Sequence, residues 1–227
     1  MGEEISNGQP SKNHQSQTFL DGEGDQWFER NKAALRNAPS KFENDTLKRV
    51  LQNHKSKLAK ILEIGCSNGV KLNDLCEYFN ASGFGIDPSP LAVDDGNKRF
   101  SKLRLSVSTA SNLPFESNSF DLVIFGFCLY LVDRSDVFKV IAEADRVLKS
   151  GGFMAIVDFD PKLPQKVPYH HSPSLFTYKT SYSNFFTAGG NYYLVAKESF
   201  SHQSDNFVVD SNERISICVL YKEPDFC

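Results

Sequence analysis

Between residues 60 and 157 the sequence alternates strictly between short apolar segments and amphipathic ones, and this alternation is what most constrains the fold. The apolar segments predict strands at 60–64, 82–86, 103–107, 121–125 and 153–157. The intervening segments predict helices at 70–79, 90–100 and 135–148, the last followed by Gly151 and Gly152, which suit a left-handed helix cap. Strands that alternate with helices pair in parallel through right-handed crossovers, so we predict a doubly wound α/β domain with a mostly parallel sheet.

The last third of the chain follows a different pattern. Residues 160–180 contain several prolines and predict a loop, and residues 181–188 suit a short helix. Segments 192–201 and 213–222 then alternate between apolar and polar residues like two long strands, with a polar turn at 203–206. We predict that they form an antiparallel hairpin at the edge of the sheet, which then has seven strands.

The N-terminal part precedes this domain and divides into two segments. Residues 1–18 are polar and predict a disordered tail. Residues 19–58 predict a helical cap, with one helix that begins near Asp25 and is closed by Pro39, and a second helix over 41–58. The two helices either form a lid over a site or cover an edge of the sheet, and the main domain then spans residues 59–227.

Composition excludes several classes of protein. The net charge of −3 gives no reason to expect a polyanionic partner. The longest apolar run, 120–132, is interrupted by Asp121 and is too short to span a membrane, and the polar N-terminus does not resemble a signal peptide. The five cysteines include no CxxC pair, which argues against a disulfide framework or a zinc site and favours free thiols in the cytoplasm.

A glycine-containing turn follows the first predicted strand, at residues 62–69 (LEIGCSNG). In a doubly wound sheet this turn lies at the carboxyl end of the strand, where the strand order reverses and ligands bind. Gly65 allows close approach of the backbone to a ligand, and Gly69 allows the next helix to start tightly against the strand. The turn is therefore the candidate ligand site.

The residues of this turn favour a cationic ligand. A dinucleotide turn that starts at Gly65 requires glycine at positions 67 and 70, where this chain has Ser67 and Val70. Glu63 places a carboxylate beside the turn, where it repels a pyrophosphate but attracts a cation such as the sulfonium or ammonium of S-adenosylmethionine. Asp87 ends the second strand, where a carboxylate can accept hydrogen bonds from both ribose hydroxyls.

Several segments in the same order resemble the class I S-adenosylmethionine-dependent methyltransferases, from residue 60 to residue 160. The similar segments are EIGCSNG (63–69), GIDPS (85–89), ASNLPF (110–115), SFDLV (119–123) and RVLKSGG (146–152). The resemblance implies a Rossmann-like fold and a methyltransferase that uses S-adenosylmethionine. The cofactor-binding residues that we expect are Glu63, Gly65, Cys66, Ser67, Gly69, Asp87, Pro88, Ala110, Ser111, Phe125 and Gly126.

Two positions depart from the family pattern. Ser67 replaces the usual middle glycine of the turn, and serine is small enough to preserve the turn. Thr109 stands where many members carry an aspartate that binds the adenine amino group. That contact then weakens or passes to Ser108, Ser111 or a backbone carbonyl.

Methyl transfer to an oxygen acceptor needs a base close to the acceptor. We expect the acceptor at the end of the fifth strand and in the loop that follows it. His170 or His171 is the candidate base, because histidine titrates near neutral pH. Asp158 is expected to hold the acceptor or orient a histidine. Tyr130, which follows the fourth strand, is a candidate residue of the acceptor site.

A second, less specific resemblance concerns the acceptor. Residues 25–31 and 178–182 are similar to methyltransferases of bacterial surface-polysaccharide and sugar-nucleotide pathways. This resemblance implies O-methylation of a small polar acceptor such as a sugar, sugar nucleotide or glycan hydroxyl. Trp27, Tyr169 and Tyr178 are candidates to stack on a sugar, or are core residues, and Lys179 is a candidate to meet a phosphate.

Other functions fit less well. No basic stretch supports nucleic-acid binding, and Ser67, Val70 and Glu63 disfavour a nicotinamide cofactor. A non-catalytic protein that keeps the fold, or a methyltransferase of another metabolite, a protein or RNA, stays as an alternative. Asp158, Asp160, His170 and His171 match no standard ligand spacing, so no metal is predicted. The oligomeric state does not follow from the sequence.

Overall fold

A computed structural model of the chain describes residues 15–37 and 41–224. Its main sheet has seven strands, and five of them run parallel. Their spatial order is β3 (Leu103–Val107), β2 (Ser82–Asp87), β1 (Lys60–Ile64), β4 (Phe120–Gly126), β5 (Leu148–Phe159), β9 (Ile215–Lys222) and β8 (Tyr192–Phe200). Strands β9 and β8 pair antiparallel at one edge, which confirms the predicted Rossmann-like fold with its C-terminal hairpin.

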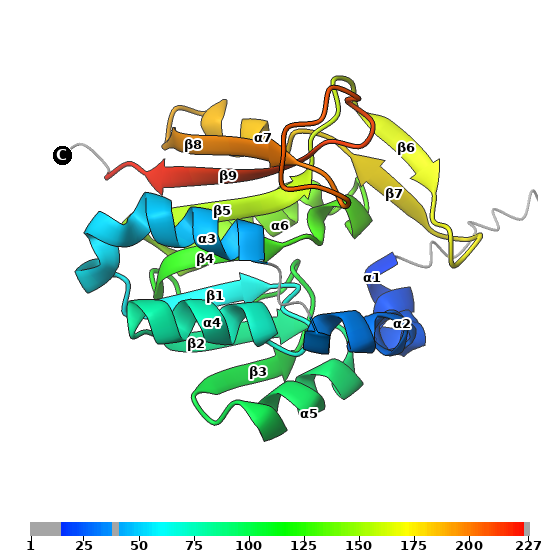
Figure 1. The fold of residues 1–227 in the computed structure, drawn as a ribbon, viewed down its shortest axis with the longest axis horizontal. Helices are drawn as coiled ribbons and strands as arrows, with labels where there is room; N and C mark the ends of the chain where they lie inside the picture. Colours follow the sequence, from blue (N-terminus) through cyan, green and yellow to red (C-terminus); the bar gives the residue numbers. More distant parts are fainter. Residues whose placement is uncertain (1–14, 38–40, 225–227) are drawn as a thin grey trace, which may run out of the picture.

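Helices cover both faces of this sheet. Figure 1 shows α3 (Lys41–Leu51) and α4 (Val70–Phe79) in front of the strands and α6 (Val137–Val147) behind them. Helix α5 (Pro90–Arg99) packs on β3, and its first turn is capped by Ser89, whose Oγ accepts a hydrogen bond from the Ala92 amide at 3.0 Å. None of the helices in the described ranges is both long and apolar enough to cross a membrane.

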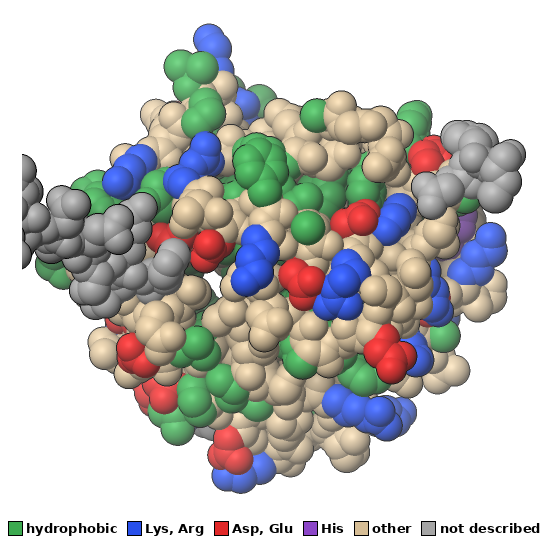
Figure 2. Space-filling model, turned by 180° about the vertical axis from the view of Figure 1, so that it is seen from behind, with side chains coloured by type: hydrophobic (Ala, Val, Ile, Leu, Met, Phe, Trp, Pro, Cys, Tyr) green, Lys and Arg blue, Asp and Glu red, His purple; other side chains and the backbone are tan. Residues whose placement is uncertain are grey.

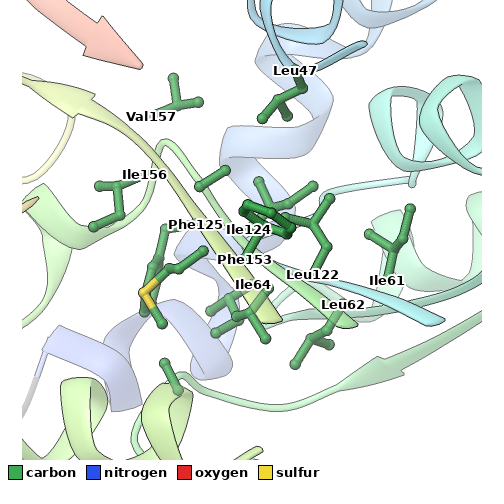
Figure 3. Packing of buried hydrophobic residues seen from close by; sticks show 14 of the residues in the cluster. Leu47, Ile61, Leu62, Ile64, Leu122, Ile124, Phe125, Phe153, Ile156 and Val157 are labelled. Atoms are coloured by element: carbon green, nitrogen blue, oxygen red, sulfur yellow. The ribbon is translucent and has the colours of Figure 1, made fainter. Parts of the chain in front are cut away.

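The core lies between the sheet and these helices. Strands β1 and β4 are buried along nearly their whole length, as expected for parallel strands covered on both faces. Figure 3 shows residues of the sheet such as Ile61, Leu122 and Phe153, together with Leu47 of α3. Burial of these side chains holds the carboxyl ends of the strands in a fixed arrangement, and these ends position the site.

Two predictions about the loops around β5 are wrong. Helix α6 ends at Val147, and the strand begins at once with Leu148, so that Gly151, with φ of 75°, lies in an irregular part of β5 instead of a helix cap. The register with β4 shifts between Phe120 and Leu122 to accommodate it. The predicted loop 160–180 contains a second, two-stranded sheet made of β6 (Gln165–Pro168) and β7 (Phe176–Lys179).

The N-terminal segment is more ordered than predicted over its last residues. The tail up to residue 14 and Pro39 lie outside the described residues, but Gln15–Thr18 form a short helix, α1, where disorder was expected. The physical reason is tertiary: the Gln15 side chain donates to the Leu131 carbonyl at 2.8 Å and accepts from the Phe176 amide at 2.6 Å. These long-range hydrogen bonds leave no local pattern in the sequence.

The predicted helical cap divides into two parts. The π-helical turn η1 (Phe19–Glu23) and α2 (Gly24–Asn37) lie at the end of the sheet to which the arrows of β1 and β4 point (Figure 1). Helix α3 packs on the face of the sheet beside α4, and a 3₁₀ segment, η2 (Gln52–Lys57), replaces the end of the predicted second helix. The first part, which we call the lid, therefore lies over this end of the sheet, and the second part covers a face of the sheet.

Candidate active site

The turn between β1 and α4 has the strained geometry that its glycine predicts. Gly65 has φ of 75°, and a Cβ atom at this position would lie 2.7 Å from Cβ of Cys128. The amides of Gly65 and Cys66 donate to the Ile86 carbonyl at 2.9 and 3.1 Å. Ser67 also has a positive φ, of 49°, so serine occupies a backbone conformation that favours glycine. The turn is preserved, as expected.

Asp87 closes this turn from the end of β2. One carboxylate oxygen accepts from the Ser67 amide at 2.8 Å, and the other accepts from the Ser89 amide at 2.9 Å. Burial raises the pKa of Asp87 to about 6, although these two hydrogen bonds oppose the shift. Asp87 thus holds the turn and also faces the cavity described below.

Glu63 is a buried acid with one oxygen unsatisfied. Its Oε2 has no hydrogen-bond partner, and burial raises its pKa to about 8, while nearby Lys71 opposes the shift. A Cβ atom at position 126 would lie 2.7 Å from Oε1, so Gly126 makes the space for the carboxyl group. A buried acid without a partner is costly. This cost indicates that a group not present in the chain itself interacts with Glu63.

Two adjoining cavities open from this turn. The large cavity, of about 790 Å³, extends from Glu63 and Asp87 to the lid helix α2 and to the loop between β8 and β9. The small cavity, of about 100 Å³, is lined by residues 108–111, by the apolar side chains Ile64 and Ile86, and by Phe19 of the lid. Gly65 and Pro88 line both cavities, so the glycine turn lies between them.

These features fit S-adenosylmethionine. The orphaned Glu63 carboxyl suits its cationic end, and Asp87 suits its ribose. The small apolar cavity beside Ala110 suits a flat base such as adenine. Thr109 stands where the family pattern has an aspartate. Its Oγ1 lies 3.2 Å from Ser111 Oγ, so these two hydroxyls are the polar groups available at that position.

The structure brings most of the predicted cofactor residues together. The residues that line one or both cavities are Glu63, Gly65, Cys66, Ser67, Asp87, Pro88, Ala110, Ser111 and Gly126. Gly69 lines neither cavity; it caps α4 with φ of 71°. Phe125 is fully buried in the core, with its ring 6.3 Å from that of Phe186.

The predicted catalytic residues are not brought to the cavities. His170 and His171 are exposed in the connection between β6 and β7. Asp158 is buried behind the cavity wall, where it accepts from the Tyr130 amide at 3.2 Å and from the Phe159 amide at 2.8 Å, and burial raises its pKa to about 8. Asp158 thus holds the turn that follows β4 in place.

The predicted acceptor residues divide into two groups. Trp27 and Tyr130 line the large cavity. Tyr169 packs in a small apolar cluster, and its hydroxyl donates to Glu23 at 3.1 Å, so it is a core residue. Tyr178 lies on β7 outside the cavities, and Lys179 places its ammonium group 3.9 Å from the centre of the Phe159 ring. No group of three or more potential metal ligands occurs within residues 15–37 and 41–224.

Sequence reasoning missed His202. This residue lies in the loop between β8 and β9 and lines the large cavity, with its ring centroid 5.3 Å from that of Phe127. Phe42 and Phe200 complete an aromatic lining. The sequence contains no signal for this grouping, because the residues come from three segments far apart in the chain and none belongs to a motif.

The chain is similar to known methyltransferases. Residues 62–156 match the family model described as a methyltransferase domain. The ubiquinone/menaquinone biosynthesis C-methyltransferase UbiE of Campylobacter jejuni (serotype O:6) is 29% identical over 122 residues, which cover 49% of this chain and 49% of that protein. UbiE of Agrobacterium fabrum is 34% identical over 125 residues, which cover 51% and 47%. The chain thus spans about half the length of these relatives.

Solved structures share the fold. A 1,6-didemethyltoxoflavin-N1-methyltransferase of Burkholderia thailandensis, solved with its substrate and S-adenosylhomocysteine, has a TM-score of 0.69 at 12% identity and covers 91% of this chain and 88% of its own. A methyltransferase of Methanosarcina mazei has a TM-score of 0.63 at 17% identity and covers 78% and 98%. The match over residues 62–156 and the shared fold agree with the resemblance to S-adenosylmethionine-dependent methyltransferases that the sequence shows.

Proposed function

We propose that the whole chain is an S-adenosylmethionine-dependent methyltransferase that acts on a small-molecule acceptor. The observation that carries the proposal is the orphaned carboxyl of Glu63 beside the glycine turn, with Asp87 at the end of the next strand. When bound, S-adenosylmethionine supplies a methyl group already activated on a sulfonium. The protein then has to align the acceptor and exclude water.

The acceptor site that we propose is the part of the large cavity between the lid helix and the loop after β8. It is enclosed by Trp27 of the lid, by Phe127 after β4, and by His202 of the loop. A cavity of this size and lining suits a small organic molecule. The names of the relatives support this choice, since UbiE is a quinone-biosynthesis enzyme and the Burkholderia enzyme is named for a small heterocycle.

A sugar or glycan hydroxyl is the second candidate acceptor. Trp27 favours it, because an indole in the wall of the large cavity can stack on the apolar face of a sugar. Tyr169 and Tyr178, the other two expected stacking residues, line neither cavity. None of the relatives named above is a polysaccharide enzyme by name.

Macromolecular acceptors receive less support. Figure 2 shows Lys and Arg side chains interspersed with Asp and Glu on the face of the molecule that it displays. The net charge of −3 also offers no general attraction for nucleic acid. A cytoplasmic location is a proposal that rests on the four described cysteines, all free thiols.

Calorimetric titration of the purified chain with S-adenosylmethionine, S-adenosylhomocysteine and NAD tests the cofactor. We expect both adenosyl ligands to bind with micromolar constants and NAD not to bind, because Ser67 and Val70 stand where a dinucleotide turn has glycine. Binding of NAD in preference to the adenosyl ligands would contradict the proposal. Binding of both adenosyl ligands without methyl transfer to any small acceptor would favour a non-catalytic protein that keeps the fold.

A further inference from the structure

Four aromatic side chains meet at the acceptor end of the large cavity and form what we call the aromatic cluster: Phe127, Tyr130, Phe159 and His202. The Phe127 ring lies 5.0 Å from each of the Tyr130 and Phe159 rings, and 5.3 Å from the His202 imidazole, between ring centroids. The imidazole meets the Phe127 ring edge to face, at 86°. Such tilted and perpendicular contacts are the favoured arrangements of aromatic rings.

The backbone places this cluster next to the expected reaction centre. Phe127 directly follows Gly126, the residue that makes space for the Glu63 carboxyl. Its backbone φ of 62° is unusual for a bulky residue and indicates strain. The Phe127 amide donates to the Val157 carbonyl at 3.1 Å, and this hydrogen bond holds the strained backbone at the end of the strand. Strain of this kind gathers at functional sites. The cluster therefore begins one residue beyond the site of the cation.

Among the histidines within residues 15–37 and 41–224, His202 is the one that lines the large cavity. Among the other described histidines, His54 packs against Phe153, with ring centroids 4.9 Å apart, and His170 and His171 are exposed beyond β6. Neither ring nitrogen of His202 has a hydrogen-bond partner among residues 15–37 and 41–224, so one nitrogen is available to an acceptor.

The surroundings of His202 favour its neutral form. Burial lowers the pKa of His202, and the nearby Lys179 ammonium lowers it further, while the Glu213 and Glu43 carboxylates raise it. Asp205, from the same loop, also lines the cavity. An imidazole that is neutral near pH 7 can take a proton, which is the property that a general base needs.

We infer that the acceptor is a planar aromatic compound with an ionisable hydroxyl group, bound against the aromatic cluster, and that His202 is the catalytic base that takes its proton. This inference rests on the proposed function. The acceptor oxygen forms a bond to the methyl carbon as the carbon–sulfur bond breaks, and the electron pair of that bond goes to sulfur. The products are the methyl ether and S-adenosylhomocysteine, and the hydroxyl proton goes to His202.

The charges and rings around the cluster suit such an acceptor better than a sugar. Seven aromatic side chains line the large cavity: Phe19, Trp27, Phe42, Phe127, Tyr130, Phe200 and His202. Lys179 places its ammonium group 3.9 Å from the centre of the Phe159 ring, so a positive charge lies beside the cluster. A phenol has a pKa of about 10, so a base has to assist its deprotonation at neutral pH.

Binding can be followed through Trp27, because it is the single tryptophan of the chain and lines the large cavity. The chain saturated with S-adenosylhomocysteine is titrated with 4-nitrophenol and with phenol. UDP-glucose is titrated in the same way to test a sugar acceptor. We expect both phenols to change the Trp27 emission with a saturable curve and UDP-glucose not to do so. Absence of binding by both phenols, or binding of UDP-glucose alone, would overturn the aromatic acceptor.

The base is tested by comparing two phenols of different acidity at about pH 8. 4-Nitrophenol is largely ionised there and needs no base, whereas phenol is protonated. We expect His202→Gln to slow methylation of phenol about a hundredfold, which is the usual contribution of a general base, and to change methylation of 4-nitrophenol only a few-fold. The wild-type rate with phenol should level off above the pKa of His202, whereas the rate of the variant should keep rising with pH toward the phenol pKa of about 10.

His54→Gln is the matched control, because His54 also packs on a phenylalanine but lies outside both cavities. If His202→Gln lowers the methylation rates of the two phenols equally, His202 has a structural role. If the variant methylates both phenols at the wild-type rate, or if no turnover of either is detected, His202 is not the base. The S-adenosylhomocysteine titration of the same variants separates the two proposals. If that ligand fails to bind the wild-type chain, the proposed function itself fails.

Discussion

At the scale of single residues, Glu63 combines a structural cost with an expected function. Its carboxyl is buried and has an unsatisfied oxygen, and its pKa is raised to about 8 by that burial. An amide in its place removes the buried acid but also the attraction for a cation. The same residue should therefore oppose stability in the free protein and favour binding of the cofactor.

Glu63→Gln tests this trade-off. We expect the variant to bind S-adenosylmethionine about ten- to a hundredfold more weakly, since a hydrogen bond to a charged group contributes about 1.5–3 kcal/mol. The midpoint of thermal unfolding of the free variant at pH 8 should be equal to or higher than that of the wild type. Calorimetry and thermal melts measure the two effects.

The control is Glu77→Gln, which makes the same chemical change at an exposed position of α4. It should leave both the affinity and the melting temperature unchanged. An unchanged affinity in Glu63→Gln would show that the cation binds elsewhere.

At the scale of elements, the short helix α1 matters because it closes the small cavity. Ser16 and Phe19 line that cavity, and Gln15 attaches the segment to both the turn after β4 and the β7 strand. The amide of Gln15 also donates to Asp133 at 2.6 Å. A ligand in the small cavity should therefore be held by the closed position of this segment.

Gln15→Ala should loosen the lid. The variant loses two side-chain hydrogen bonds and leaves the Leu131 carbonyl and the Phe176 amide unpaired, at a cost of about 1–3 kcal/mol. We expect faster hydrogen exchange over residues 15–23 and about tenfold weaker binding of S-adenosylhomocysteine. Gln17→Ala is the control, since the Gln17 side chain bonds only within the segment, to Asp21 at 2.7 Å. Equal rates of hydrogen exchange in the two variants would contradict the role of the Gln15 hydrogen bonds in holding this segment in place.

At the scale of the whole molecule, three buried carboxyl groups share the same direction of pKa shift. Burial raises the pKa of Glu63 and of Asp158 to about 8, and that of Asp87 to about 6. The folded state therefore binds more protons than the unfolded state between the ordinary and the raised pKa values. Stability from these groups is fully present below their unfolded pKa and is lost as the pH rises through the folded values.

We expect the melting temperature of the ligand-free chain to fall as the pH rises from about 5 to above 8. Saturating S-adenosylmethionine should reduce this fall, because its cationic end compensates the ionised Glu63 and its hydroxyls bind Asp87. Thermal melts over this pH range, with and without ligand, measure both effects. A melting temperature that rises with pH in the free chain would contradict the buried-acid account.

Local patterns were sufficient for much of this protein. The alternation of apolar and amphipathic segments predicted a mostly parallel seven-stranded sheet with an antiparallel C-terminal hairpin, because side-chain periodicity and crossover handedness are local properties. The turn at 63–69 and the acid at Asp87 predicted the cofactor site for the same reason. Strand ends in a parallel sheet meet at one edge, whatever the rest of the chain does.

Properties that depend on distant segments were decided only by the tertiary structure. The β6–β7 hairpin exposes His170 and His171, the histidines that the sequence favoured, and the loop after β8 brings His202 against Phe127 instead. Gln15 is ordered by partners more than a hundred residues away. These outcomes depend on packing between segments that share no local pattern. The sequence by itself thus determined the sheet and the glycine turn, and tertiary packing decided the lid and the lining of the large cavity.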